Sequence, residues 1–388
     1  MLRALFWLGL FFLAAAAIAY GATVQDGIAI PRDGAGLVVG RDFLNTWMYG
    51  RAAALPDPGY WYDIASYQNA LTALLGSGYP GQSWSAPPSL MLFTAPFGQM
   101  PYLAALACWT LLGVTLFTGV LYRARFNTTS LVALLASPAA VFCAISGQSA
   151  LMIAAMLIAI LQQLDRRPVL AGVLIGCLTL KPQLVVLFPV MLAASGRWRV
   201  FIAAAVTALA IAGVTAALFG TQVWVDFIER GLPTQWVVLQ AADHVAAPFY
   251  PSLYVNLRGF GLAAPVALTV QAMAGLAAAM LVWRVFRAHR DADPRILAAL
   301  FLAASATAMP SLASSDTLAL TVAALALLRG GLLDPSGRLL VQLLYWLPLL
   351  QLGLGQIHVP GPGLVAPAFA LYLAARLRPQ GCPALQPV

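Results

Sequence analysis

The sequence predicts an all-α polytopic membrane protein, on the basis of its composition and its apolar runs. Of its 388 residues 61% are hydrophobic and only 9% are charged, and the mean hydropathy is +0.85. Soluble domains carry roughly 25% charged residues, so a soluble fold is excluded. Runs of about 20 apolar residues, the length that crosses a bilayer as a helix, recur along the chain. No stretch remains for a separate soluble domain, so residues 1–388 are expected to form one integral membrane domain.

About twelve apolar runs are candidate transmembrane helices. The first could pass for a signal peptide, but no cleavage site stands apart from its alanines, so it is expected to remain as a helix. The candidate spans are 4–24, 101–122, 129–145, 149–164, 169–180, 183–195, 200–219, 261–283, 296–310, 317–328, 339–354 and 362–375.

The distribution of basic residues predicts the orientation of these spans. With the N-terminus in the cytoplasm, fifteen of the 21 basic residues fall on the cytoplasmic side, as the positive-inside rule requires. This distribution accounts for the net charge of +8 without nucleic acid, and it predicts a multi-pass protein of the bacterial inner membrane. The fifteen are Arg3, Arg123, Arg125, Arg166, Arg167, Arg197, Arg199, Arg284, Arg287, Arg290, Arg295, Arg329, Arg338, Arg376 and Arg378.

Two long connections, about 25–100 and 220–259, are expected on the periplasmic side, where most of the carboxylates also fall. They contain amphipathic stretches, among them NTWMYGRAAAL and YWYDIASYQNALTALL, which suit helices lying in the membrane interface. The cytoplasmic connections are too short for a nucleotide-binding domain, and the sequence has no Walker or Rossmann fingerprint. Any active site is therefore expected on the periplasmic face.

Two charged residues are the strongest candidates for chemistry. Asp42 lies between aromatic residues in GRDFLNTWMYGRA, soon after the first span, and is the carboxylate singled out for a functional role. Lys181 is the only lysine and interrupts an apolar stretch at CLTLKPQLVVLFP. A cation near membrane depth is costly and suits a phosphate, although a lysine that reaches the headgroups is the alternative.

Three further polar positions are expected at the same face. Gln148 lies between two spans in SPAAVFCAISGQSALM, and Asp316 lies in the small-residue turn MPSLASSDTLAL, where it could instead be a helix cap. His244 lies in the second long connection, where a solvated or structural role is the alternative. The four cysteines have no paired spacing and indicate neither a metal site nor a disulfide.

Several stretches together resemble glycosyltransferase family 87, whose members are membrane enzymes with the GT-C fold. The resemblance runs from about Gly40 to Arg199 and returns weakly near Asp316. The stretches are RDFLNTWMYGRA, PPSLMLFTAPF, SPAAVFCAISGQSAL, AGVLIGCLTLKPQLVVLFP, RWR and MPSLASSD.

The resemblance implies a hexosyltransferase that moves a sugar, with mannose favoured, from a polyprenyl-phosphate donor to a glycolipid or glycan hydroxyl. Asp42 matches the acidic residue of the first outer loop and is the expected general base of an inverting reaction. Lys181 and Arg258 are then expected to bind the donor phosphate. No metal and no cofactor is expected. The implied substrate-binding residues are Arg41, Asn45, Gln148, Gln183, His244 and Asp316.

Two other functions remain possible from the sequence. A bundle of apolar helices with broken spans and buried polar groups also suits a transporter or lipid flippase, although the sequence has no convincing internal repeat. A structural assembly subunit would tolerate replacement of Asp42 and Lys181.

Overall fold

A computed structural model describes residues 1–27, 29–241 and 247–377, so His244 lies outside the described residues. The described chain is built from helices joined by turns and short connections, with isolated bridges Gln25–Arg32 and Arg32–Val38. The α-helices are α1 (Leu2–Gly21), α2 (Phe43–Ala52), α3 (Ile64–Leu75), α4 (Leu90–Gly98), α5 (Tyr102–Arg123), α6 (Thr128–Leu135), α7 (Pro138–Ser146), α8 (Ala150–Gln163), α9 (Pro168–Cys177), α10 (Phe188–Ser195), α11 (Trp198–Phe219), α12 (Gln222–Asp226), α13 (Leu232–Ala241), α14 (Leu253–Gly259), α15 (Ala264–Ala288), α16 (Pro294–Ala308), α17 (Leu318–Arg329), α18 (Pro335–Gln356) and α19 (Val365–Arg376).

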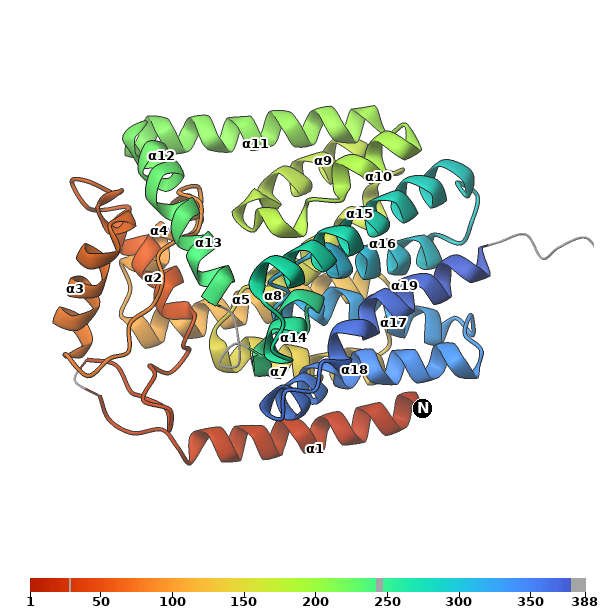
Figure 1. Ribbon diagram of the computed structural model, residues 1–388, viewed down its shortest axis with the longest axis horizontal. Helices are drawn as coiled ribbons and strands as arrows, with labels where there is room; N and C mark the ends of the chain where they lie inside the picture. Colours follow the sequence, from red (N-terminus) through yellow and green to blue (C-terminus); the bar gives the residue numbers. More distant parts are fainter. Residues whose placement is uncertain (28, 242–246, 378–388) are drawn as a thin grey trace, which may run out of the picture.

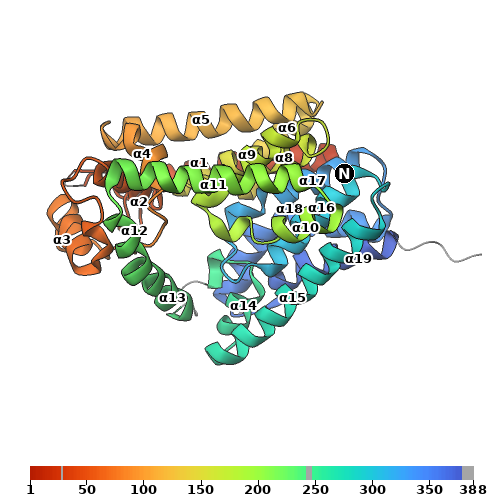
Figure 2. The same ribbon diagram turned by 90° about the horizontal axis from the view of Figure 1, so that it is seen from above.

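The long helices lie roughly side by side, and the first long connection gathers at one end of them. Figure 1 shows α1 and α11 along opposite edges of the bundle, with α2, α3 and α4 at the end where α1 finishes. Figure 2, turned by 90°, shows α5 running from α4 at that end to α6 at the other, where the chain begins. One end of the molecule is therefore rich in short helices, and the opposite end is formed by the termini of the longer helices.

Five helices are long and apolar enough to cross a membrane: α1, α5, α11, α15 and α18. Helices α6 and α7 make a sixth span if the pair is counted as one. They do not form one straight helix, because the chain bends by 50° where Ser137 and Pro138 break the predicted span 129–145. Helices α8, α9, α10 and α16 are apolar but shorter. These helices and the apolar surface confirm membrane character, while the number of twelve spans stays a prediction.

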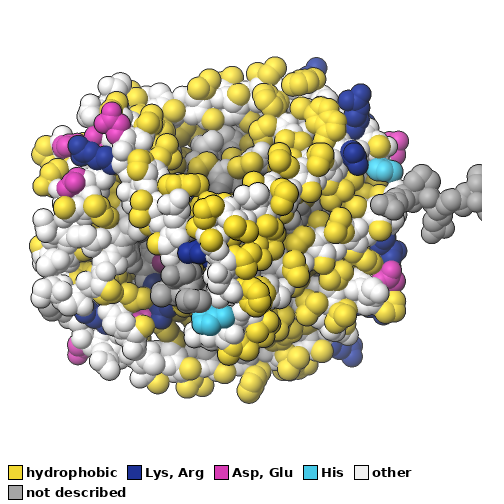
Figure 3. Space-filling view, in the orientation of Figure 1, with side chains coloured by type: hydrophobic (Ala, Val, Ile, Leu, Met, Phe, Trp, Pro, Cys, Tyr) yellow, Lys and Arg dark blue, Asp and Glu magenta, His cyan; other side chains and the backbone are white. Residues whose placement is uncertain are grey.

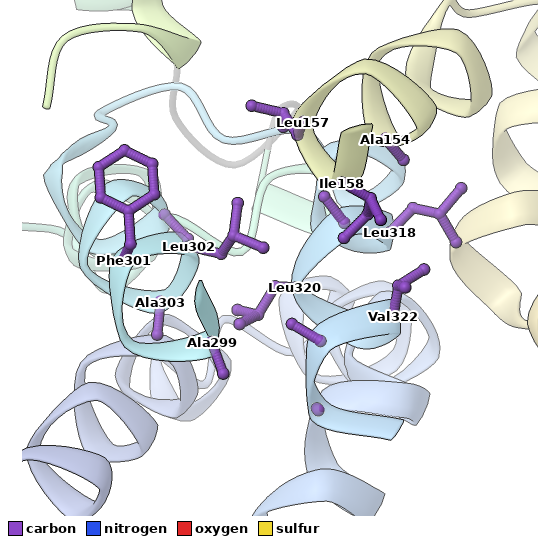
Figure 4. Packing of buried hydrophobic residues seen from close by; sticks show 14 of the residues in the cluster. Ala154, Leu157, Ile158, Ala299, Phe301, Leu302, Ala303, Leu318, Leu320 and Val322 are labelled. Atoms are coloured by element: carbon purple, nitrogen blue, oxygen red, sulfur yellow. The ribbon is translucent and has the colours of Figure 1, made fainter. Parts of the chain in front are cut away.

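The main core is formed by α8, α16 and α17 with the helices around them. Figure 4 shows side chains of these three helices meeting, among them Leu157, Phe301 and Leu320. The three helices are largely buried, whereas α1, α11 and α15 expose many large apolar side chains. Figure 3 shows hydrophobic side chains over much of the surface of the bundle, as expected for contact with lipid.

Close packing of α9 on α11 depends on two glycines spaced four residues apart. A methyl group added at Gly172 would lie 2.5 Å from the Cβ of Ala203, and one added at Gly176 would lie 2.5 Å from the Cβ of Thr207. Small residues at this spacing let two helix backbones approach closely inside a membrane. This contact fixes α9, and with it the turn that follows α9 and carries Lys181.

The first long connection has its own aromatic core, which differs from the interfacial helices expected there. Trp84 is fully buried and stacks on Tyr49, with ring centroids 3.6 Å apart, and Tyr62 and Tyr67 contact the same indole. The hydroxyls of Tyr49 and Tyr62 both donate to the carbonyl of Ala86, over 2.9 and 2.7 Å. Most of α2 is therefore buried inside this cluster, and its N-terminus is held rigidly.

Candidate active site

Asp42 occupies the N-cap of α2, and its backbone is fixed from both sides. Its amide donates to the carbonyl of Ser146, 3.0 Å away, which ties α2 to the end of α7. The preceding residue, Arg41, has a φ of +29°, an unfavourable value for a residue with a side chain. Arg41 is held there by its ion pair with buried Asp33, with Nε 2.6 Å from Oδ2, and by Gln82, whose Nε2 donates to the Arg41 carbonyl over 2.9 Å.

Gln148 connects Asp42 to the C-terminal half of the chain. Its Nε2 donates to Oδ2 of Asp42 over 2.5 Å, and its Oε1 accepts a hydrogen bond from the hydroxyl of Ser315. A carboxylate only accepts hydrogen bonds, so the amide group of Gln148 must face Asp42 with its NH₂. The turn that delivers Gln148 depends on Gly147, which has a φ of +63° and would place a Cβ 2.5 Å from that of Phe43.

Lys181 and Asp316 form an ion pair next to this bridge. The Nζ of Lys181 lies 2.7 Å from Oδ1 of Asp316, and the two side chains are 25% and 3% exposed. Lys181 lies in a break between two short 3₁₀ turns, Leu178–Leu180 and Pro182–Leu184, and Asp316 lies in a third, Ser314–Thr317. Because Ser315 precedes Asp316, the same turn contacts Gln148 and Lys181.

The surroundings of Asp42 raise the pKa of its carboxyl above the usual value. Loss of hydration among surrounding protein atoms is the largest cause, even though Asp42 as a whole is exposed. The Gln148 hydrogen bond and the charges of Lys181 and Arg41 lower the pKa in part, and the charge of Asp316 raises it. A carboxylate with a raised pKa is a better proton acceptor than an ordinary aspartate.

Ser315 belongs to the site through its hydrogen bond to Gln148, although sequence reasoning singled out neither Ser315 nor the nearby Tyr250. Burial, with smaller contributions from the charges of Asp42 and Asp316, raises the pKa of Tyr250 to about 12, so its phenol lies within electrostatic range of both carboxylates. The stretch PFYPSLYVN offered an aromatic residue in the second long connection, but nothing in its spacing pointed to Asp42.

The other predicted residues lie apart from this group or support it. Asn45 donates to the carbonyl of Ser83 over 2.9 Å and accepts from Tyr67, so it supports the aromatic core. Gln183 lines a small cavity of about 50 Å³ near α16. Arg258, in α14, donates to the carbonyl of Leu262 over 2.7 Å, and among the described residues it makes no contact with Lys181 or Asp42.

A groove of about 280 Å³ is lined in part by Thr179 and Pro182, which lie on either side of Lys181 in the sequence. Its walls come from the turn that carries Lys181, from α11, from α12 with the adjoining π-helical turn Phe227–Gly231, and from the first long connection. The lining is mostly apolar and includes Thr179, Pro182, Ile211, Trp224 and Phe227. Within the described ranges no group of three His, Cys, Asp or Glu side chains could hold a metal ion.

A family model for glycosyltransferase family 87 matches residues 84–315, which is more than half of the chain. The chain belongs to glycosyltransferase family 87. The matched region contains Gln148, Lys181 and Ser315, while Asp42 precedes it and Asp316 follows it by one residue. No curated protein and no solved structure matches. The protein is thus a membrane glycosyltransferase of family 87, and the family is the one expected from the sequence.

Proposed function

We propose that this family 87 glycosyltransferase moves a hexose, with mannose favoured by the resemblance, from a polyprenyl-phosphate donor to the hydroxyl of a glycolipid or glycan. The observation that carries the proposal is the Asp42–Gln148–Ser315 bridge beside the Lys181–Asp316 pair. It puts a proton acceptor and a cation into one site, which is what transfer of a sugar from a phosphate requires.

Asp42 acts as the general base in this scheme. The acceptor hydroxyl passes its proton to the carboxylate of Asp42 while its oxygen forms a bond to the anomeric carbon. The bond from that carbon to the phosphate oxygen breaks on the opposite face, so the configuration inverts and the bonding electrons leave with the polyprenyl phosphate. Gln148 holds the carboxylate in place, since its NH₂ occupies one of the two carboxylate oxygens.

Lys181 stabilises the leaving phosphate as a point charge. Its ion pair with Asp316 holds the ammonium in place, and its 25% exposure leaves hydrogen-bonding capacity for a phosphate oxygen. The groove suits the first isoprene units of the donor, since apolar side chains form most of its lining. A metal ion is not required, because the leaving group is a monophosphate.

The reaction is assigned to the periplasmic face of the inner membrane. Most of the arginines lie on the opposite side of the predicted spans, and the positive-inside rule places that side in the cytoplasm. Alkaline phosphatase fused after Gly76, in the first long connection, should be active in intact cells, whereas a fusion after Arg197 should be inactive. The reverse pattern would place the site in the cytoplasm.

The direct test is transfer of radiolabelled sugar from a panel of polyprenyl-phosphate sugars to a lipid extract by the reconstituted protein. Wild type should transfer at least one sugar, and Asp42→Asn should be inactive with an unchanged melting temperature. Asp26→Asn is the matched control, because Asp26 is exposed in the same connection and should be replaceable.

Full activity of folded Asp42→Asn would remove Asp42 from the mechanism. Turnover of a soluble nucleotide sugar would contradict the lipid-linked donor, and sugar-lipid movement across vesicles without transfer would favour the flippase alternative.

A further inference from the structure

A second cavity, of about 420 Å³, lies at the opposite end of the bundle and is lined by Arg123, Gln163, Arg166 and Arg167. Arg123 ends α5, Gln163 ends α8, and the other two arginines directly precede α9. Helix α5 has 22 residues, and its first residue, Tyr102, packs on Phe43 next to Asp42. Because an α-helix rises about 1.5 Å per residue, the two ends of α5 are roughly 30 Å apart. The cavity is therefore separated from the Asp42 end of the molecule by about the thickness of the hydrocarbon core.

Among the residues that the structure describes, the three arginines of this cavity have no carboxylate partner. Asp165 is the nearest acidic residue in the sequence, but Arg197 binds both of its oxygens, with Nε–Oδ1 at 2.9 Å and Nη2–Oδ2 at 3.1 Å. In the described part of the chain, neither Arg123 nor the pair before α9 takes part in an ion pair. Three guanidinium groups therefore face one cavity with no ion-pair partner in the described part of the chain. A general excess of arginine at this end of the molecule does not explain why three of them line the same cavity.

Exposed apolar side chains lie near the cavity on α5, which supplies Arg123, and on α9, which begins directly after Arg167. They lie within about two helical turns of the arginines, on the outward surfaces of α5 and α9. Figure 3 shows several basic side chains at this end of the molecule, beside the hydrophobic side chains of the bundle, and others at the opposite end. The exposed residues are Leu116, Tyr122, Val169, Leu170 and Val173.

We propose that this cavity binds the phosphate of an anionic phospholipid headgroup, with the acyl chains lying against the exposed residues of α5 and α9. Arginine binds phosphate oxygens through paired N–H donors, and three such groups match one phosphodiester better than a neutral headgroup. Basic pockets between transmembrane helices are a known mode of headgroup recognition. A free phosphate offers the same charge but leaves the apolar flanks uncovered, so the lipid is the better match.

The test measures binding of tail-labelled phosphatidylglycerol to the purified full-length protein in a neutral detergent, by fluorescence anisotropy. The variant R123Q/R166Q/R167Q should bind about tenfold or more weakly, because each charge near a membrane surface contributes severalfold to lipid affinity. The control R284Q/R287Q/R338Q removes three exposed arginines at the ends of α15 and α18 and should change the affinity less than about twofold. Melting temperatures of both variants check that they are folded.

Several results would overturn the proposal: equal losses in the two variants, equally tight binding of phosphatidylcholine by the wild type, or displacement of the label by millimolar inorganic phosphate. The last would mean that a small anion, and not a lipid, is the ligand. If the triple variant does not fold, the three single variants replace it, and each should bind about twofold to fivefold more weakly. Unchanged binding by all three would also overturn it.

Discussion

Replacing Lys181 with Met should destabilise the protein, because it leaves Asp316 as a carboxylate with little access to water. The Asp316 side chain is 3% exposed, and Lys181 is its ion-pair partner at 2.7 Å. Breaking a fully buried pair costs about 3–5 kcal/mol, whereas an exposed pair contributes about 0–1 kcal/mol. Since Lys181 is 25% exposed, the pair lies between these limits but nearer the first. We therefore expect a loss of about 2–3 kcal/mol in the free energy of unfolding.

The double variant Lys181→Met/Asp316→Leu separates the ion pair from the packing around it. Removing both charges should leave the free energy of unfolding within about 1 kcal/mol of wild type, because no unpaired charge remains. The assay is unfolding in mixed micelles titrated with sodium dodecyl sulfate, for wild type, both single variants and the double variant. If the double variant loses the sum of the two single losses, the pair has no coupling energy and the reasoning is refuted. Sugar transfer should still fail in the stable double variant, since the leaving phosphate lacks its cation.

Three further predictions concern the bridge and its support. Gln148→Leu removes a hydrogen bond that lowers the pKa of Asp42, so the pKa should rise and the acid limb of the pH–rate profile should move to higher pH. Gly147→Ala adds a Cβ at a φ of +63° and 2.5 Å from that of Phe43, which should cost about 2–3 kcal/mol of unfolding free energy. Trp84→Ala empties the centre of the aromatic core and should cost about 3–5 kcal/mol.

Each of these variants has a matched control on the same chain. Gln162→Leu, at an exposed position on α8, should leave the pH profile unchanged. Gly213→Ala lies inside α11 where an added Cβ meets nothing within 4 Å, so stability should be unchanged or rise by about 1 kcal/mol. Tyr60→Ala, 54% exposed, should cost less than about 1 kcal/mol. A pH profile of Gln148→Leu that matches wild type would contradict the account of the site. So would a Gly147→Ala or Trp84→Ala variant that is as stable as its control, Gly213→Ala or Tyr60→Ala.

The sequence was sufficient to single out most of the candidate site but not its connections. Asp42 and Lys181 stood out as charges beside apolar or aromatic stretches, and Gln148 and Asp316 as polar groups in turns between spans. Their pairing could not be read from the chain, because Asp42 is 106 residues from Gln148 and Lys181 is 135 residues from Asp316. Ser315 was missed because a serine beside an aspartate is typical of an ordinary helix cap.

Hydrophobic runs predicted where helices occur but not how far each one extends across a membrane. The run 129–145 has the composition of one span, yet Pro138 cannot continue the preceding helix and the chain bends there. The amphipathic stretch NTWMYGRAAAL suggested a helix in the interface, whereas contacts with distant residues such as Trp84 bury most of Phe43–Ala52. Both differences arise from tertiary packing, which periodicity within one segment does not encode.

Lys181 also gives the protein an unusual chemical property. Apart from the terminal amine, its Nζ is the single primary amine of the chain, and Thr179 and Pro182, on either side of it in the sequence, line the apolar groove. An amine-selective acylating reagent would therefore modify one side chain, and the extent of modification could be counted by intact mass without peptide mapping. Protection of that one amine by a polyprenyl phosphate would measure occupancy of the proposed donor site directly, even in a variant that cannot complete the transfer.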